Sequence, residues 1–297
     1  MPIDLNVVIL TYNEQENLPR CFESLKPLAC PIYVIDSGST DGTLDTAVEN
    51  GAMVVQHPFT THVEQWSWGM ENLPLKCEWV LGLDADQSLT RELAGELLDT
   101  FSRPIPDAID GYYIKRRQIF RGHWIRHGGY YPKLLLKLFR RGRVLFDPSD
   151  LLDHHFYVSG RTLNLRHDLL EDNRKESDLD FWMQKHIRYA ALVAKEEYKW
   201  RTCAAATPLT PAWFGTPDQR ILEMKKLWRK LPLYVRPTLY FLYRYFFRGG
   251  WIDGKDGFLF HFLHAFWFRV LVDAKLDELL SSGAPACRSK AIVKTNV

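Results

Sequence analysis

The sequence predicts an α/β protein, in which a doubly wound, mostly parallel sheet precedes a helical, aromatic-rich C-terminal extension. Short β-branched runs alternate with helical patterns over the first hundred residues, which is typical of strands buried between two helical layers. Turn-forming polar residues follow these runs. The chain has 297 residues, of which 46% are hydrophobic and 25% charged. It can therefore bury a large core, and a mostly disordered chain is excluded.

The alternation divides the chain into predicted elements. Buried parallel strands are predicted at 5–10, 32–35, 52–56 and 79–83. Helices are predicted at 14–25, 43–50 and 62–72, and in a segment that Thr90 caps. Later strands are predicted at 112–119, 134–139 and 156–158, and a long helix at 179–197.

Polar segments follow three of the predicted parallel strands, at 11–13, 36–41 and 84–86. Ligands of such sheets bind beyond the carboxyl ends of the strands, so these segments are expected to share one site. Asp84 and Asp86 lie two positions apart, which places both carboxylates on one face of an extended segment. Such hard oxygen donors suit Mg²⁺ or Mn²⁺ bound together with substrate phosphates. The alternative is a turn that is merely rich in Asp.

Asp36 ends the second predicted strand. Its carboxylate can accept hydrogen bonds from a base N–H or a ribose hydroxyl, or it can serve as a turn or helix cap. Gly38 and Gly42 would allow the backbone to approach a ligand closely. The chain has neither the G-x-G-x-x-G fingerprint nor a Walker A loop, which argues against a dehydrogenase and a P-loop enzyme.

Three segments resemble, in order and spacing, the signatures of family 2 glycosyltransferases. They are residues 8–14 (VILTYNE), 34–43 (VIDSGSTDGT) and 83–86 (LDAD). Four later segments are similar to the bacterial branch that includes lipopolysaccharide core β-1,4-glucosyltransferases: residues 127–132, 138–141, 167–168 and 188–190. The closely matching part covers residues 5–105.

The resemblance implies a GT-A fold, a nucleotide-diphosphate sugar donor and inversion at the anomeric carbon. It makes Asp86 the ligand of Mg²⁺ or Mn²⁺ on the diphosphate. It places nine further motif residues around the donor: Thr11, Tyr12, Asn13, Glu14, Asp36, Ser37, Gly38, Asp84 and Ala85. We expect a nucleotide-sugar-binding and catalytic domain over 1–175, a helical region over 176–280 and a disordered tail over 281–297.

Inversion by a single displacement needs a base that accepts the proton of the acceptor hydroxyl. Candidates are Asp150, Asp153, His154, His155, Asp168, Glu171 and Asp172. We favour Asp153 because it precedes the strand-like run 156–158 and can project from a strand end. His154 is the second choice, since imidazole titrates near neutral pH. The alternative for this segment is a turn with a solvated histidine pair.

Charge is distributed unevenly along the chain. Residues 1–110 carry 18 acidic and 5 basic side chains, whereas residues 111–146 carry ten basic side chains and no acidic one. Arginines in this basic block can bind the donor diphosphate, an anionic acceptor or a lipid head group. For most of the block, however, we expect a solvated edge strand.

The C-terminal third interleaves basic and aromatic residues over 220–248, and an aromatic run follows at 258–272. This composition suits helices that rest on an anionic membrane surface, with a buried helical pair as the alternative. No nucleic-acid reading motif accompanies it, so nucleic acid is not an expected partner.

The predicted function is a metal-dependent inverting glycosyltransferase that acts on a cell-envelope glycan or glycolipid. The five cysteines are scattered, and no signal peptide or run of about 20 apolar residues is evident. We therefore expect a cytoplasmic protein, or one peripheral on the cytoplasmic face of the inner membrane. Two alternatives are a nucleotidyltransferase on a similar sheet and a non-catalytic membrane-docked scaffold. The first would need a Gly-rich loop directly after the first strand, and the Asp84/Asp86 pair argues against the second.

Overall fold

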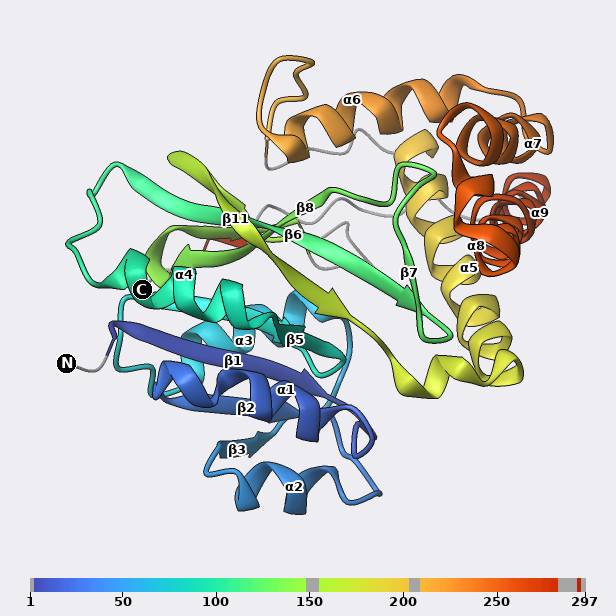
Figure 1. The fold of residues 1–297 in the computed structure, drawn as a ribbon. Helices are drawn as coiled ribbons and strands as arrows, with labels where there is room; N and C mark the ends of the chain where they lie inside the picture. The colour runs from blue at the N-terminus through green and yellow to red at the C-terminus, as the bar shows by residue number, and fades with distance from the viewer. Residues whose placement is uncertain (1–2, 148–154, 203–208, 283–292, 295–297) are drawn as a thin grey trace.

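The computed structural model describes residues 3–147, 155–202, 209–282 and 293–294. A nine-stranded sheet carries helices on both faces, and a helical C-terminal part lies beside it (Figure 1). The strand order is β3-β2-β1-β4-β8-β6-β11-β5, with β7 paired to β6. This arrangement confirms the predicted fold class.

The elements of the structure have the following bounds. The strands of the large sheet are β1 (Leu5–Thr11), β2 (Ile32–Asp36), β3 (Met53–Gln56), β4 (Trp79–Asp84), β5 (Gln87–Leu89), β6 (Ile109–Phe120), β7 (His123–Ile125), β8 (Lys133–Arg140) and β11 (Arg161–Glu171). A small sheet joins β9 (Val144–Phe146), β10 (Tyr157–Val158) and β12 (Val293–Lys294). The α-helices are α1 (Leu18–Leu25), α2 (Thr43–Glu49), α3 (His62–Asn72), α4 (Arg91–Phe101), α5 (Leu179–Thr202), α6 (Pro217–Lys230), α7 (Val235–Leu242), α8 (Gly254–His261) and α9 (Phe268–Ser281). Shorter helical segments are η1 (Lys26–Leu28), η2 (Arg141–Arg143), η3 (Arg174–Ser177), η4 (Tyr243–Phe247), η5 (Gly250–Asp253) and η6 (Phe262–Trp267).

The first half of the sheet is parallel, because β1 pairs in parallel with β2 and β4, and β2 pairs in parallel with β3. β1 is buried along its whole length. Its alternate side chains enter two different cores: Val7 and Ile9 pack with α1 and α4 on one face, and Val8 and Leu10 pack with α3 on the other. Burial on both faces explains why this strand is a continuous apolar run.

The second half of the sheet is mixed in direction. β8 runs antiparallel to both β4 and β6, while β11 runs parallel to β6 and antiparallel to β5. Because β8 lies inside the sheet, Lys137 and Arg140 are buried, with 4% and 3% of their surface exposed. The expectation of a solvated edge strand is wrong for these two residues. The Arg140 guanidinium instead donates to the carbonyl of Ile109 and lies over the Trp79 ring.

The first helix begins later than its pattern predicts, at Leu18 rather than residue 14. Asn13 has a φ of 54°, which breaks the helical path. The backbone N–H of Glu14 donates to the Thr43 hydroxyl at 2.7 Å. Residues 13–17 therefore form a loop that packs on the loop following β2.

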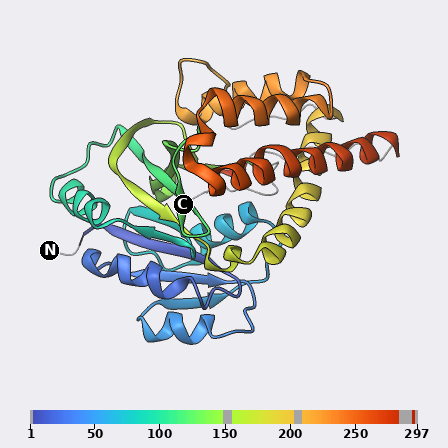
Figure 2. The same cartoon turned by 45° about the vertical axis from the view of Figure 1, so that its right-hand side comes forward.

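The C-terminal helices gather beside the sheet, and α5 connects the two parts (Figures 1 and 2). Ala190 and Ala194 of α5 pack against Val272 and Leu276 of α9. Among the described residues, one helix, Gly250–Ser281, is long and apolar enough to cross a membrane, with a mean hydropathy of 1.2 in its most apolar window. Of that window, 44% is buried inside the protein, and core helices pass the same test.

Of the expected tail, Ser281 and Ser282 close helix α9, and beyond residue 282 the structure describes only Val293 and Lys294. These two residues pair antiparallel with β9. Ser281 and Ser282 therefore belong to the helix end and not to a disordered tail. Disorder of the residues outside the described part, like the domain boundary near residue 175, stays a prediction.

Two buried histidines lie among the C-terminal helices. The His186 ring stacks on Trp182 with 3.5 Å between ring centroids, and its Nδ1 lies 2.8 Å from the Trp182 carbonyl oxygen. A carbonyl can only accept, so Nδ1 carries the proton. Burial lowers the pKa of His186 to about 4. Burial, followed by the Arg244 charge, lowers the pKa of His261 to about 4 as well.

These depressed pKa values predict that the protein loses stability in mild acid. The unfolded imidazole has a pKa near 6.5 and binds a proton more readily than the folded one, so stability is complete above about pH 6.5 and is lost as pH falls toward about 4. The loss is roughly 3 kcal/mol for each histidine. Urea unfolding at stepped pH measures it, and His186→Gln should flatten the profile while the exposed-site control His167→Gln should not. Identical profiles for the His186→Gln variant and the unmodified chain would refute this account.

Candidate active site

The carboxyl ends of three parallel strands meet at one edge of the sheet. Thr11 of β1 pairs in register with Asp36 of β2, and Leu10 of β1 pairs with Asp84 of β4. The Thr11 hydroxyl donates to Asp36 Oδ1 at 3.0 Å. The sheet order thus brings together residues that are dispersed over the first 84 positions.

Asp36 organises the loop that follows β2. It is fully buried, and its Oδ2 accepts hydrogen bonds from the backbone N–H groups of Gly38 at 2.9 Å and Ser39 at 2.8 Å. Gly38 has a φ of 89°, a conformation that favours glycine. Both oxygens of the Asp36 carboxylate therefore accept hydrogen bonds from groups of the protein itself. At the same edge of the sheet, Tyr12 is 58% exposed.

The loop after β1 is fastened to the loop after β2 and to a distant lysine. The Asn13 N–H donates to the Ser39 hydroxyl at 2.8 Å, and the Ser37 hydroxyl accepts from Gln65 at 3.3 Å. Lys175 Nζ lies 2.7 Å from Glu14 Oε1 and donates to the Asn13 carbonyl at 2.8 Å. The Glu14 carboxylate therefore forms an ion pair with Lys175 within the protein.

The two carboxylates of the 84–86 turn have different partners, and Ala85 between them is buried. Asp84 Oδ2 forms an ion pair with Lys137 at 3.0 Å. Asp86 Oδ2 accepts a hydrogen bond from the Asn173 amide at 3.2 Å. Within the described ranges, no cation lies within ion-pair distance of Asp86.

The surroundings of Asp86 disfavour its charged form, and the Lys185 charge offsets only part of this effect. Burial raises the pKa of Asp86 well above its ordinary value, and the negative charges of Glu171 and Asp84 raise it further. A divalent cation would offset this repulsion, and carboxylate oxygens are suitable ligands for Mg²⁺ or Mn²⁺. The described side chains provide no group of three or more acidic, histidine or cysteine residues that could hold a metal alone. A cation at Asp86 would therefore need phosphate oxygens or water as further ligands.

The segment after β11 completes the candidate site, although no local motif marks it. Glu171 accepts from Arg116 at 2.9 Å and from Gln87 at 2.9 Å. Asn173, which contacts Asp86, also accepts from the amide of buried Asn17 at 3.1 Å. The sequence predicted roles for Asp86 and Glu171, whereas no local pattern marks Asn17, Gln87 or Asn173.

Asp153 and His154, the favoured bases, lie outside the described residues. Three other candidates are held in ion pairs: Asp168 with Arg117 and Lys115, Glu171 with Arg116, and Asp172 with Arg20. A general base needs a lone pair that can reach the acceptor hydroxyl. In these three carboxylates, oxygen lone pairs already bind Arg or Lys side chains.

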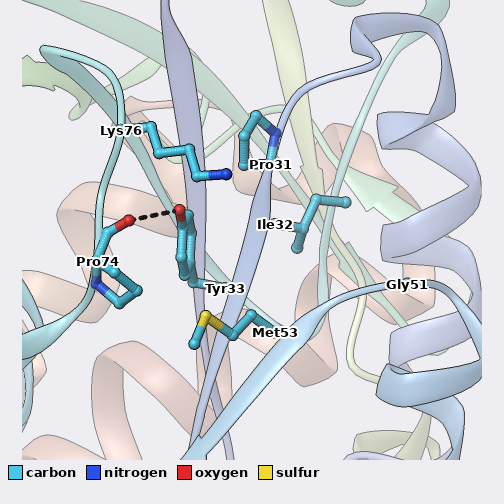
Figure 3. A pocket seen from close by; sticks show the side chains of 7 residues that line it. All are labelled: Pro31, Ile32, Tyr33, Gly51, Met53, Pro74 and Lys76. Atoms are coloured by element: carbon cyan, nitrogen blue, oxygen red, sulfur yellow. Dashed lines mark hydrogen bonds between the residues drawn. The ribbon is translucent and has the colours of Figure 1, made fainter.

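A surface hollow lies away from these residues (Figure 3). It is lined by Pro31, Ile32, Tyr33, Gly51, Met53, Pro74 and Lys76. These residues stand at the amino ends of β2 and β3 and in the segment before β4, opposite the strand ends that hold Asp36. The hollow contains no carboxylate, and we assign it no part in the site.

The fold and the candidate site indicate a class of protein: α/β proteins of this kind bind ligands beyond the carboxyl ends of their parallel strands, which here end beside the Asp-x-Asp turn. Residues 6–169 match the family model described as glycosyl transferase family 2. The chain belongs to this family and is a glycosyltransferase.

Relatives of similar length carry glycosyltransferase names. An uncharacterized glycosyltransferase of Rickettsia bellii is 28% identical over 291 residues, which cover 96% of this chain and 90% of the relative. The lipopolysaccharide core biosynthesis glycosyltransferase LpsC of Rhizobium meliloti is 28% identical over 270 residues, with 86% of each protein covered.

Solved structures give more distant likenesses. Staphylococcus aureus TarS (residues 1–349) is 14% identical with a TM-score of 0.41, covering 94% of this chain and 91% of that one. Glucosyl-3-phosphoglycerate synthase of Mycobacterium tuberculosis, crystallised with Mn²⁺ and uridine diphosphate, is 17% identical with a TM-score of 0.42, covering 71% and 83%.

Proposed function

We propose that this glycosyltransferase moves a sugar from a nucleotide-diphosphate donor to a cell-envelope glycan or glycolipid, with inversion and with a divalent cation. The observation that carries the proposal is the convergence of Thr11, Asp36 and the 84–86 turn at one sheet edge. The acceptor class is supported by the name of the Rhizobium meliloti relative.

The chain's own residues hold the donor. The exposed Tyr12 ring offers a stacking surface for the base, while Asp36 fixes the loop of Ser37 and Gly38 against which the ribose would lie. Asp84 is held by Lys137 at the start of the turn, and Asp86, two residues further on, would bind the cation on the diphosphate. Mg²⁺ or Mn²⁺ bound by Asp86 would stabilise the negative charge of the departing diphosphate.

Metal removal tests the proposed function. Incubation with radiolabelled nucleotide-diphosphate sugars and extracted envelope glycans should give labelled glycan in Mg²⁺ or Mn²⁺, and EDTA should abolish the transfer. Added metal should restore it. A chain that binds no nucleotide sugar, or that transfers equally well in EDTA, would overturn the metal-dependent mechanism.

We assign the base to Asp153, with His154 as the second choice. Proton removal by a positioned base contributes about 10²-fold or more to the rate, so Asp153→Asn should lower kcat by at least about that factor. Donor affinity should change little, because the base acts on the acceptor. Isothermal titration with the donor and steady-state kinetics separate the two effects. Unchanged turnover would move the base to His154 or elsewhere, and Asp45→Asn, at an exposed position on α2, is the control.

We place the enzyme in a reducing compartment, on the cytoplasmic side. Cys21, Cys30 and Cys77 are all free thiols in the described part of the chain. Burial raises the pKa of Cys21 and of Cys30 to about 12, so neither thiol is reactive near neutral pH. The chain therefore does not depend on these cysteines for covalent cross-links.

A further inference from the structure

Two helical segments of the C-terminal part expose apolar side chains on one continuous surface. Leu239, Tyr243, Phe246 and Phe247 follow one another at helical spacing along α7 and η4, and Phe247 is 83% exposed. Across from them, α8 exposes Phe258. We call these five residues and Trp251 of η5 the aromatic face.

Ring contacts join the two segments into one surface. The Tyr245 ring lies 5.1 Å from that of Phe246 and 5.6 Å from that of Phe258. Phe258 in turn stacks on Phe262 at 5.9 Å. Phe246 and Phe258 are therefore connected through Tyr245 and are not isolated surface residues, as expected of an exposed patch that binds a partner.

The exposed charges beside the aromatic face are positive. Arg248 and Lys255, which flank the η5 turn, are both exposed. The acidic Asp253 of this turn is buried, and its carboxylate accepts from the N–H and Nδ1 of His127. Asp256 is half-buried. A partner that binds this surface must therefore offer apolar groups to the aromatic rings and negative charges to Arg248 and Lys255.

We infer that the aromatic face binds the surface of an anionic lipid bilayer. Trp, Tyr and Phe side chains enter the interfacial region, and nearby Arg and Lys side chains bind anionic head groups. The helix Gly250–Ser281 lies at this surface and does not cross the bilayer, because its α9 part packs against Ala190 and Ala194 of α5. Charge complementarity favours lipid over a second copy of the chain, since two copies would oppose like charges.

The same elements connect the aromatic face to the sheet. Arg244 Nε donates to the Gly128 carbonyl at 2.6 Å, and the Gly128 N–H donates to the Arg248 carbonyl at 2.9 Å. The Tyr131 hydroxyl, in the same loop, donates to Asp168 of β11 at 3.1 Å. Because β11 leads to Glu171 at the candidate site, the bilayer would be held at a fixed position relative to that site. Presentation of a lipid-linked acceptor rests on the proposed function; bilayer binding does not.

Vesicle flotation of the full-length protein tests the inference. The protein should float with phosphatidylcholine–phosphatidylglycerol vesicles and not with phosphatidylcholine alone, and high salt should weaken the binding. Phe247→Ser/Trp251→Ser should lower partitioning by roughly tenfold or more. Met53→Ser, which removes an exposed apolar side chain from the sheet, should bind as the unmodified protein does. The charge-reversal variant Arg248→Glu/Lys255→Glu should also lower partitioning onto anionic vesicles, whereas the control Arg103→Glu should not.

The outcomes separate the bilayer from other occupants. Failure of the unmodified protein to bind anionic vesicles, or equal binding by Phe247→Ser/Trp251→Ser, overturns the inference. A dimer in analytical ultracentrifugation that the same double variant abolishes would assign the face to a second copy. Transfer to a soluble glycan fragment should be unchanged in the double variant. Vesicle binding without any sugar transfer would overturn the proposed function but would still support binding of the aromatic face to a bilayer.

Discussion

Asp86→Ala is expected to lower sugar transfer by roughly 10³-fold while the protein stays folded. Asp86 is the carboxylate of the strand-end turn that has no direct ion pair among the described residues, and its pKa is raised by burial and then by Glu171 and Asp84, with Lys185 offsetting only part of the rise. Removing it takes away the protein ligand of the cation, and with it the charge stabilisation of the leaving diphosphate. Transfer assays in excess Mg²⁺ or Mn²⁺ measure the loss.

Folding and metal binding provide the controls for this variant. Because Asp86 is half-buried near like charges, its removal should leave the midpoint of thermal unfolding unchanged or raise it. Electron paramagnetic resonance of Mn²⁺ in the presence of donor should show weaker binding. Asp45→Ala, an exposed carboxylate on α2, should retain both activity and metal binding. Turnover of the Asp86→Ala protein at the normal rate would contradict the metal assignment.

Asp273→Ala is expected to destabilise the C-terminal helices by about 3–5 kcal/mol, because it breaks a buried ion pair. Arg236 is fully buried, and its Nε donates to Asp273 Oδ1 at 2.8 Å. Arg236 Nη2 also lies 2.9 Å from Glu197 Oε2, so one guanidinium links α7 to α9 and α5. The variant leaves this charge underpaired and leaves the Tyr234 N–H without its acceptor, Asp273 Oδ2.

Asp277→Ala is the matched control, since it lies one turn further along α9 and is exposed. Asp277 accepts from the Tyr234 hydroxyl at 2.9 Å, and loss of such an exposed contact should cost less than about 1 kcal/mol. Urea unfolding monitored by tryptophan fluorescence compares the two variants. Equal midpoints for Asp273→Ala and Asp277→Ala would show that the buried pair contributes nothing to stability.

The parallel half of the sheet could be predicted from the sequence because its signal is local. Continuous apolar runs such as that of β1 arise when both faces of a strand are covered, and the turn-forming residues after them mark where each strand ends. The structure has β2 ending at Asp36 and β4 ending at Asp84. Strand-end carboxylates could therefore be identified before the neighbouring strands were known.

The charge pattern of the sequence was less informative, because it does not report burial. Lys137 belongs to a block expected to be mostly solvated, yet it is buried and pairs with Asp84. In the aromatic C-terminal third, Arg236 is buried in an ion pair while Arg248 is exposed. These arginines look alike in the sequence, and only the packing of the helices distinguishes them.

The sequence by itself determined the α/β class, the strand ends that carry Thr11, Asp36 and Asp84, and the glycosyltransferase signatures. Only the tertiary structure placed Lys175 beside Glu14, although 161 residues separate them, and Asn173 beside Asp86. The physical reason is the range of each signal. Apolar periodicity and turn chemistry depend on residues a few positions apart, whereas contacts across the site depend on which strands become neighbours and how their loops pack together.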